Sequence, residues 1–178
     1  MIKYKIHYKQ FGGNLQYNFT YGELTREGLK NLLSNYDTNN KTFYDLGSGK
    51  GNVLVYAAEE FNNLEKIIGV ELDENRHNLA KDMIEKKNMT DKVKVINDDF
   101  LSNKNNYSDA DFIYVSNLCF PNEVNLAIYK KLNAELKDGA IIMSSKNLNF
   151  GNNFQQNSTL VAQTWDNNSE IYVNKFKK

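Results

Sequence analysis

The sequence predicts an α/β fold: a mostly parallel, seven-stranded sheet with helices on both faces and a C-terminal antiparallel hairpin. Three observations support it. Apolar runs of strand length alternate with segments of helical period from residue 42 to residue 144. A glycine-rich turn, residues 47–51, joins the first strand and helix of this series. Two further strand-like segments end the chain with no helix between them.

Length and composition exclude several classes of protein. The 178 residues suit one catalytic domain, 1–178, in which residues 1–40 form a short N-terminal segment and helix ahead of the core. Lys plus Arg and Asp plus Glu both number 22, so a strongly basic, nucleic-acid-binding body is excluded. No apolar run reaches the about 20 residues of a membrane-spanning helix, and residues 1–5 lack the apolar core that a secretory signal would have. We expect an intracellular protein.

The first half of the chain predicts three strands and two helices. Strands are expected over residues 42–46, 66–71 and 92–97, which are rich in β-branched and aromatic residues. Between them, residues 53–61 and 75–87 carry apolar side chains at helical spacing. The order strand, helix, strand, helix, strand favours parallel pairing, with a ligand at the carboxyl ends of the strands.

The second half predicts two more parallel strands and a terminal hairpin. Residues 110–115 and 140–144 are strand-like apolar runs, and residues 123–136 between them have helical period. Residues 158–165 and 170–176 flank a polar turn at 166–169 and are expected to pair antiparallel. A hairpin after the fifth strand is the usual arrangement in class I (Rossmann-like) methyltransferases, whereas a plain dinucleotide fold ends on parallel strands.

The glycine turn and the residues beside it predict a cofactor site. A nicotinamide fingerprint reads Gly-x-Gly-x-x-Gly, but Asn52 stands where the third glycine is expected, and Asp45 precedes Gly47 by two residues. A carboxylate there repels a pyrophosphate and suits the ammonium group of S-adenosyl-L-methionine. The alternative is a tight turn without a ligand.

Two further acidic positions fit the adenosine of that cofactor. Glu71 ends the second strand, 20 residues after Gly51, at the offset of an acid that binds ribose hydroxyls. Asp99 and Phe100 follow the third strand, where a carboxylate and an aromatic ring would meet adenine. The alternative for Asp99 and Phe100 is a solvated loop.

Six short motifs in order carry a closer resemblance. They are Tyr21-Gly-Glu23, Asp45 to Gly51, Gly69-Val-Glu71, Asp99-Phe-Leu-Ser102, Ser144-Ser-Lys146, and Trp165 with Tyr172. Together they resemble the disruptor-of-telomeric-silencing (Dot-like, non-SET) histone lysine methyltransferases over about residues 15–178. This family methylates a lysine of histone H3 on the nucleosome core.

The resemblance implies roles for individual residues. The implied cofactor contacts are Tyr21, Glu23, Asp45, Gly47, Gly49, Asn52, Glu71, Asp99 and Phe100. The implied lysine channel and methyl-transfer end comprise Ser116, Asn117, Phe120, Trp165 and Tyr172. The aromatic residue that precedes the Tyr-Gly-Glu motif in the family corresponds to Tyr17 or Phe19.

Three departures from the family pattern leave alternatives open. The family has two asparagines where this chain has Ser116-Asn117, threonine at Leu24, and glutamine at Asn52. Methyl transfer to another protein or to a nucleic-acid amine is one alternative, because residues 116–120 stand where amino-methylating enzymes carry an Asn-Pro-Pro-Tyr-like motif. A catalytically inert cofactor-binding module is the other.

The implied partner is the nucleosome, through histone H3 and nucleosomal DNA, with this chain a monomer that does not bind membranes. Basic residues near both termini would contact phosphates: Lys3, Lys5, His7, Lys9, Lys175, Lys177 and Lys178. Frayed, soluble ends are the alternative. The location would be a nucleus or a viral replication compartment, and the Asn-Lys richness suggests a viral or parasite source. Cys119 is expected to be a small core residue, and no metal site is predicted.

Overall fold

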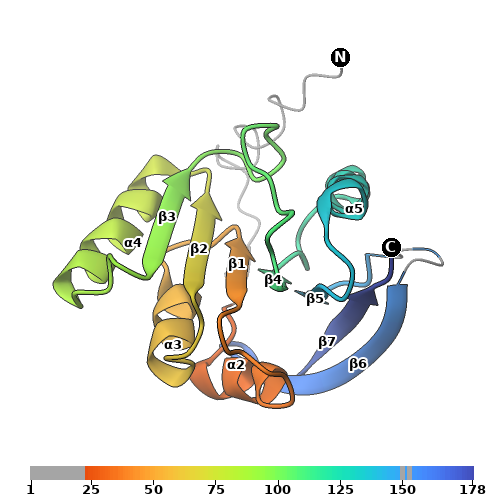
Figure 1. Ribbon diagram of the computed structural model, residues 1–178, viewed down its shortest axis with the longest axis horizontal. Helices are drawn as coiled ribbons and strands as arrows, with labels where there is room; N and C mark the ends of the chain where they lie inside the picture. The colour runs from red at the N-terminus through yellow and green to blue at the C-terminus, as the bar shows by residue number, and fades with distance from the viewer. Residues whose placement is uncertain (1–22, 149–150, 152–153) are drawn as a thin grey trace.

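The computed structural model describes residues 23–148, 151 and 154–178. They form a seven-stranded sheet in the order β3-β2-β1-β4-β5-β7-β6 (Figure 1). β1 to β5 pair in parallel, and β7 runs antiparallel to both β5 and β6. This topology confirms the predicted fold, including the hairpin at its C-terminal end.

The first five strands and the helices between them begin and end close to the predicted residues, whereas the two hairpin strands begin earlier. The strands are β1 (Thr42–Leu46), β2 (Lys66–Glu71), β3 (Val93–Asn97), β4 (Phe112–Val115), β5 (Ile141–Ser144), β6 (Phe154–Gln163) and β7 (Asp166–Phe176). The helices are α2 (Arg26–Leu33), α3 (Asn52–Glu60), α4 (Glu74–Lys86) and α5 (Asn122–Glu135). For β1 to β5 and α3 to α5 the agreement is close because each segment carries its own apolar period.

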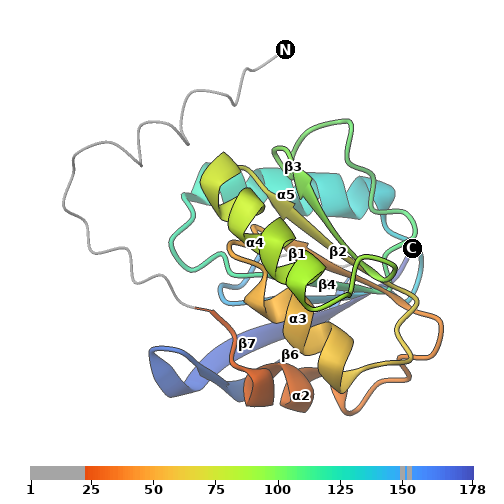
Figure 2. The same ribbon diagram turned by 90° about the vertical axis from the view of Figure 1, so that its left-hand side faces the viewer.

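The helices are divided unequally between the two faces of the sheet. α2, α3 and α4 pack their apolar residues on one face, around Phe43, Ile67 and Tyr114. On the other face α5 packs on Leu46, Val70 and their neighbours. Figure 2 shows α3 and α4 in front of the strands and α5 behind them. Among the described helices, α5 alone covers its face, so the loops beside it contribute to that core.

A glycine in β2 lets the sheet approach the turn after β1. A Cβ on Gly69 would lie 2.5 Å from Ser48 Oγ and 2.6 Å from Leu54 Cδ1. Both distances are far below van der Waals contact, so any larger residue would push the turn and the start of α3 away from β2. Packing therefore explains the glycine of the Gly69-Val-Glu71 motif.

The hairpin turn lies earlier than the sequence predicts. The β6–β7 pairing ends at Gln163 and Asp166, so Thr164 and Trp165 form the turn and residues 166–169 belong to β7. The prediction was wrong because Asp166, Asn167 and Asn168 are typical turn residues by composition. In the structure these three residues are exposed on a strand. They therefore lack the alternation of apolar and polar residues from which a strand is recognised in a sequence.

The hairpin is tied to the segment before α2. Leu24 forms an isolated antiparallel bridge with Gln163, and Thr25 donates from both its N–H and its hydroxyl to the Ala162 carbonyl. A Cβ on Gly28 would collide with that same carbonyl oxygen. Figure 2 shows α2 against the hairpin. Leu24 is 1% exposed, so the family's polar threonine is replaced here by a core residue.

The described residues also bear on Cys119, on membrane-spanning helices and on metal-binding groups. Cys119 is exposed, which corrects its expected place in the core; it lies in the loop between β4 and α5 rather than under the sheet. No helix within residues 23–148 and 154–178 is both long and apolar enough to cross a membrane. Within the same residues, no three His, Cys, Asp or Glu side chains are arranged so that they could hold a metal ion.

Candidate cofactor and methyl-transfer site

Three carboxylates meet at the carboxyl edge of the sheet. Asp45 lies in β1, Glu71 ends β2, and Glu23 precedes α2. Asp45 and Glu71 are each only 3% exposed. Three parts of the chain thus bring acidic side chains close enough to act on one another.

Asp45 is the most strongly perturbed of these groups. Burial, and then repulsion from Glu23 and Glu71, raises the pKa of its carboxyl well above the ordinary value. A buried anion beside two like charges is unfavourable unless a cation joins them. The arrangement therefore favours a positively charged ligand over a phosphate.

Glu71 fixes the glycine turn through a hydrogen bond to its backbone. Its Oε2 accepts the Gly49 N–H at 2.8 Å, and its Oε1 accepts from Arg76 Nη2 at 2.8 Å. Oε1 also accepts the Asp73 N–H at 2.8 Å. Arg76 Nε donates to Oε1 as well, at 3.2 Å, so three donors share Oε1 and that oxygen is fully used. Oε2 accepts only the Gly49 N–H among these bonds, so it is the oxygen that suits a further donor such as a ribose hydroxyl. The sequence did not mark Arg76 as a site residue, because a polar residue at this position of a helix is expected on any exposed surface.

The backbone of the glycine turn is already bonded to β2. The N–H groups of Gly47 and Ser48 both donate to the Val70 carbonyl, at 2.8 and 3.2 Å. Gly51 donates to Ser48, and it has φ of +84°, which favours glycine. Phosphate-binding turns aim such N–H groups at the ligand. Because these are committed within the protein, the turn is not built as a phosphate cradle.

Glu23 is fixed by two partners on different elements. Asn52, the first residue of α3, donates from Nδ2 to Glu23 Oε2 at 2.6 Å. Thr164, in the hairpin turn, accepts the Glu23 N–H through Oγ1 at 3.0 Å and donates its own N–H to the Glu23 carbonyl at 2.9 Å. The predicted contacts Glu23 and Asn52 are therefore brought together. Tyr21, Tyr17 and Phe19 lie outside the described residues.

The loop after β3 brings a predicted cofactor residue against a predicted acceptor residue. Asp99 accepts the Leu101 N–H at 2.8 Å, which fixes its carboxylate. Phe100 is 5% exposed and stacks on Phe120, with ring centroids 5.9 Å apart and planes at 22°. The predicted cofactor and acceptor regions therefore share an aromatic contact.

Asn117 is used to hold two loops together. It is fully buried, its Nδ2 donates to Asn125 Oδ1 at 2.8 Å and to the Lys146 carbonyl at 3.1 Å, and its Oδ1 accepts the Lys146 N–H at 2.8 Å. These bonds suit a positioning role for Asn117 more than a direct contact with an amine. Ser116 lies against the Tyr114 hydroxyl, the neighbour of Asp45 in the sheet.

Trp165 and Tyr172 lie on different stretches of the hairpin. Trp165 is in the turn, next to Thr164, whereas Tyr172 pairs with Ser144 at the end of β5. Asp166 and Tyr172 are six residues apart in one strand, a path of about 20 Å. The described residues therefore do not bring the two aromatic rings together as neighbours. The Tyr172 hydroxyl donates to Glu170 at 2.8 Å, and this pair is exposed.

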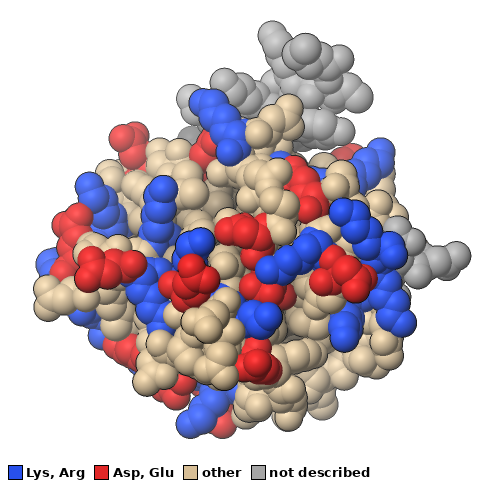
Figure 3. Space-filling model, in the orientation of Figure 1, with Lys and Arg blue, Asp and Glu red and all other residues tan. Residues whose placement is uncertain are grey.

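The C-terminal basic residues lie away from this edge. Lys175 pairs with Ile141 at the start of β5, and the Lys178 N–H donates to Asp138. These are the amino ends of the parallel strands, opposite the carboxylates. Figure 3 shows basic and acidic side chains interspersed over one face of the molecule. The basic N-terminal residues 3–9 fall outside the described part of the chain.

Sequence comparisons find methyltransferases. The model of the family described as histone methylation protein DOT1 matches residues 3–175. A protein-lysine N-methyltransferase of Saccharolobus islandicus (strain REY15A) is 33% identical over 103 residues, 57% of this chain and 59% of that protein. An H3 lysine-79 specific histone-lysine N-methyltransferase of Caenorhabditis elegans is 30% identical over 154 residues, 80% of this chain and 16% of that protein. The chain thus spans less than two thirds of either relative.

Solved structures show the fold. An RNA methyltransferase of Salinibacter ruber in complex with S-adenosyl-L-homocysteine has a TM-score of 0.67 at 18% identity, over 84% of this chain and 90% of that chain. TrmN of Thermus thermophilus has a TM-score of 0.69 at 16% identity, over 85% of this chain and 48% of that chain. The fold is the class I, Rossmann-like methyltransferase fold.

Proposed function

The chain belongs to the DOT1 family, whose fold and activity are those of S-adenosylmethionine-dependent protein-lysine methyltransferases, and from this we propose that it methylates a lysine of histone H3 in the nucleosome core. The observation that carries the cofactor assignment is the cluster of Glu23, Asp45 and Glu71 at the glycine turn. S-adenosylmethionine carries an ammonium and a sulfonium, and both charges suit this cluster.

The residues of the cluster fit separate parts of the cofactor. Asp45 and Glu23 suit the methionine end, Glu71 the ribose, and Asp99 with Phe100 the adenine. A nucleotide with phosphates would meet three carboxylates and a turn whose N–H groups are already bonded. The proposal therefore rests on charge as well as on family membership.

The chemistry requires a neutral amine. S-adenosylmethionine would supply a methyl group on a positive sulfur. The amine lone pair would form the new nitrogen–carbon bond as the carbon–sulfur bond breaks, and the sulfur would leave as a neutral thioether. A lysine ammonium, with a pKa of about 10.4 in water, has no lone pair. An apolar surround that includes Phe120 would disfavour the charged form and let the proton leave to water. Alignment of the neutral amine with the methyl group then lowers the remaining barrier, so no strong general base is required.

The acceptor is the finer part of the proposal. The C. elegans relative is named for lysine 79 of H3, and this supports a histone acceptor. The S. islandicus relative is named only as a protein-lysine methyltransferase, so a lysine of another protein is the second candidate. A nuclear or viral-compartment location follows only from the histone acceptor. The viral or parasite source stays a prediction.

One experiment tests both parts. We would measure S-adenosylmethionine binding by calorimetry, then follow radiolabelled methyl transfer to intact nucleosomes, free histone octamers, other basic proteins and naked DNA, with peptide mapping of products. We expect micromolar binding and label on H3 that requires intact nucleosomes. Label on another protein would overturn the proposal that histone is the acceptor. Label on DNA would overturn the proposal that the acceptor is a lysine. Cofactor binding without any label would favour an inert module.

A further inference from the structure

The loop between β3 and β4 is held by side chains that lie outside the proposed contacts. Residues 98–111 connect two parallel strands without forming a helix, although such connections usually contain one. Connections of this length without secondary structure are commonly mobile or functional. This one carries Asp99 and Phe100. Whatever fixes the loop therefore fixes where the adenine contacts lie.

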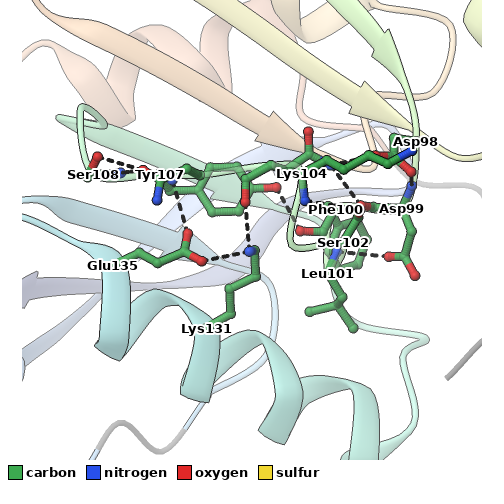
Figure 4. Close-up of polar contacts among 12 residues, drawn as sticks. Asp98, Asp99, Phe100, Leu101, Ser102, Lys104, Tyr107, Ser108, Lys131 and Glu135 are labelled. Atoms are coloured by element: carbon green, nitrogen blue, oxygen red, sulfur yellow. Dashed lines mark hydrogen bonds and ion pairs between the residues drawn. The ribbon is translucent and has the colours of Figure 1, made fainter. Parts of the chain in front are cut away.

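An ion pair on α5 grips the loop backbone at two points (Figure 4). Lys131 Nζ donates to the Asn105 carbonyl at 2.7 Å and lies 2.7 Å from Glu135 Oε1. Glu135 Oε2 accepts the Tyr107 N–H at 3.0 Å. The Lys131 side chain is 9% exposed and its ammonium lies 5.3 Å from the centre of the Tyr107 ring.

From those two points, hydrogen bonds continue to the adenine contacts. Asn105 donates from Nδ2 to the Asp99 carbonyl at 2.8 Å. The Tyr107 hydroxyl donates to the Phe100 carbonyl at 2.8 Å. Burial raises the pKa of Tyr107, so its hydroxyl keeps the proton that it donates. Each member of the ion pair is therefore linked through one residue to one adenine contact.

We propose that Lys131 and Glu135 are positioning residues for the adenosine of the cofactor, acting through Asn105 and Tyr107. The inference rests on the proposed S-adenosylmethionine-dependent activity. A partly buried ion pair adds little stability over apolar residues of the same size, but it dictates geometry through directed bonds. The directed bonds here end on the carbonyls of the two residues that would meet adenine.

The chain contains a matched control on another helix. Lys81 and Glu85 have the same spacing on α4, but they are 3.9 Å apart, 60% and 52% exposed, and pair along the helix surface. Replacing Lys81 or Glu85 removes the same charges without touching the loop. Exposed pairs of this kind contribute little to stability.

The test compares Lys131→Met and Glu135→Gln with Lys81→Met and Glu85→Gln in the full chain. Calorimetry gives the affinity for S-adenosylmethionine, hydrogen exchange reports on residues 98–107, and steady-state kinetics separate KM from kcat. We expect the α5 variants to bind S-adenosylmethionine roughly 10-fold more weakly, with faster exchange in the loop, raised KM and little change in kcat. The α4 variants should match wild type.

Equal affinities in the two sets of variants would overturn the proposal, even if the α5 variants melt at a lower temperature. If Lys131→Met does not fold, Tyr107→Phe decides, because it keeps the ring and removes only the hydroxyl bonded to Phe100. Unchanged affinity in that variant would also overturn it. A wild-type chain that binds no S-adenosylmethionine would instead refute the proposed function itself.

Discussion

The two sides of the sheet's carboxyl edge differ in how their buried polar groups are satisfied. On the glycine-turn side, Glu71 and the turn backbone have protein partners, although the buried hydroxyls of Ser48 and Tyr114 lack a hydrogen bond. On the hairpin side, the buried side chains of Ser144, Gln163 and Asn174 have polar atoms without a hydrogen bond. Buried polar atoms without a partner are uncommon and destabilising.

This difference suggests different roles for the two sides. The glycine-turn side is preorganised, with its charges fixed by the backbone, as a binding site for one constant cofactor requires. The hairpin side has buried polar atoms without a hydrogen bond, and such atoms suit a methyl-accepting substrate that binds and is released. Substitutions on the first side should change cofactor affinity, whereas those on the second should change stability and turnover.

The largest effect is expected at Asp45. Asp45→Asn removes the charge proposed to meet the methionine ammonium, and we expect S-adenosylmethionine affinity to fall about 100-fold. The free energy of unfolding without cofactor should rise, because folding then no longer has to bury a carboxyl beside Glu23 and Glu71. Asp111→Asn is the control: it removes an acid that accepts the Thr42 N–H and pairs with Lys137, far from the cluster. It should destabilise the fold and leave affinity unchanged, as calorimetry and denaturant titration would report.

A second prediction compares a glycine required by close packing, Gly69, with a glycine required by its positive φ, Gly139. Gly69→Ala would force the turn and α3 apart, and we expect about 1–3 kcal/mol of destabilisation together with weaker cofactor binding. Gly139→Ala offers the comparison, since Gly139 has φ of +83° but nothing within 4 Å of an added Cβ. That variant should lose about 1 kcal/mol and keep its affinity. Equal losses of affinity would mean that Gly69 has no special role at the site.

The third expectation is a pH dependence. The raised pKa of Asp45 means that the folded chain holds a proton that the unfolded chain has lost above about pH 4. This stabilisation is present at low pH and decreases as pH rises, by at most about 1.4 kcal/mol per pH unit. Cofactor affinity should rise over the same window, with proton release on binding. Calorimetry in buffers of different ionisation enthalpy measures that release, and Asp45→Asn should abolish it.

The smallest effect is expected at Gln163, which is 2% exposed and has no hydrogen bond on either amide atom. Gln163→Met keeps the volume and removes the buried amide, so we expect about 1 kcal/mol of added stability. If the amide serves the acceptor, methyl transfer should slow while cofactor affinity holds. A variant both less stable and fully active would contradict the contrast between the two sides.

The glycine-turn side could be predicted from the sequence because its determinants are local. Asp45, the glycines and Glu71 lie at the ends of strands that are recognisable from their own composition. Their proximity then follows from parallel topology alone. Only their supports were missed: Arg76 and Thr164 contribute through bonds that no local pattern marks.

The hairpin side could not be predicted to the same depth because long-range pairing decides it. Asp166 to Ser169 read as a turn by composition, but pairing with β6 keeps them in a strand and moves Trp165 into the turn. The same shift separates Trp165 from Tyr172. Asn125, Lys131 and Glu135 were likewise missed, since a helix surface carries such residues for many reasons and their partners lie in remote loops.

The link between Glu23 and Thr164 joins positions 141 residues apart. Proteins are made from the N-terminus at roughly 5–20 residues per second, so Glu23 emerges from the ribosome many seconds before the residue that fixes it. Until Thr164 has been made, Glu23 lacks the two hydrogen bonds that hold its backbone, so the carboxylate cluster is fixed only after the β6–β7 turn has been translated.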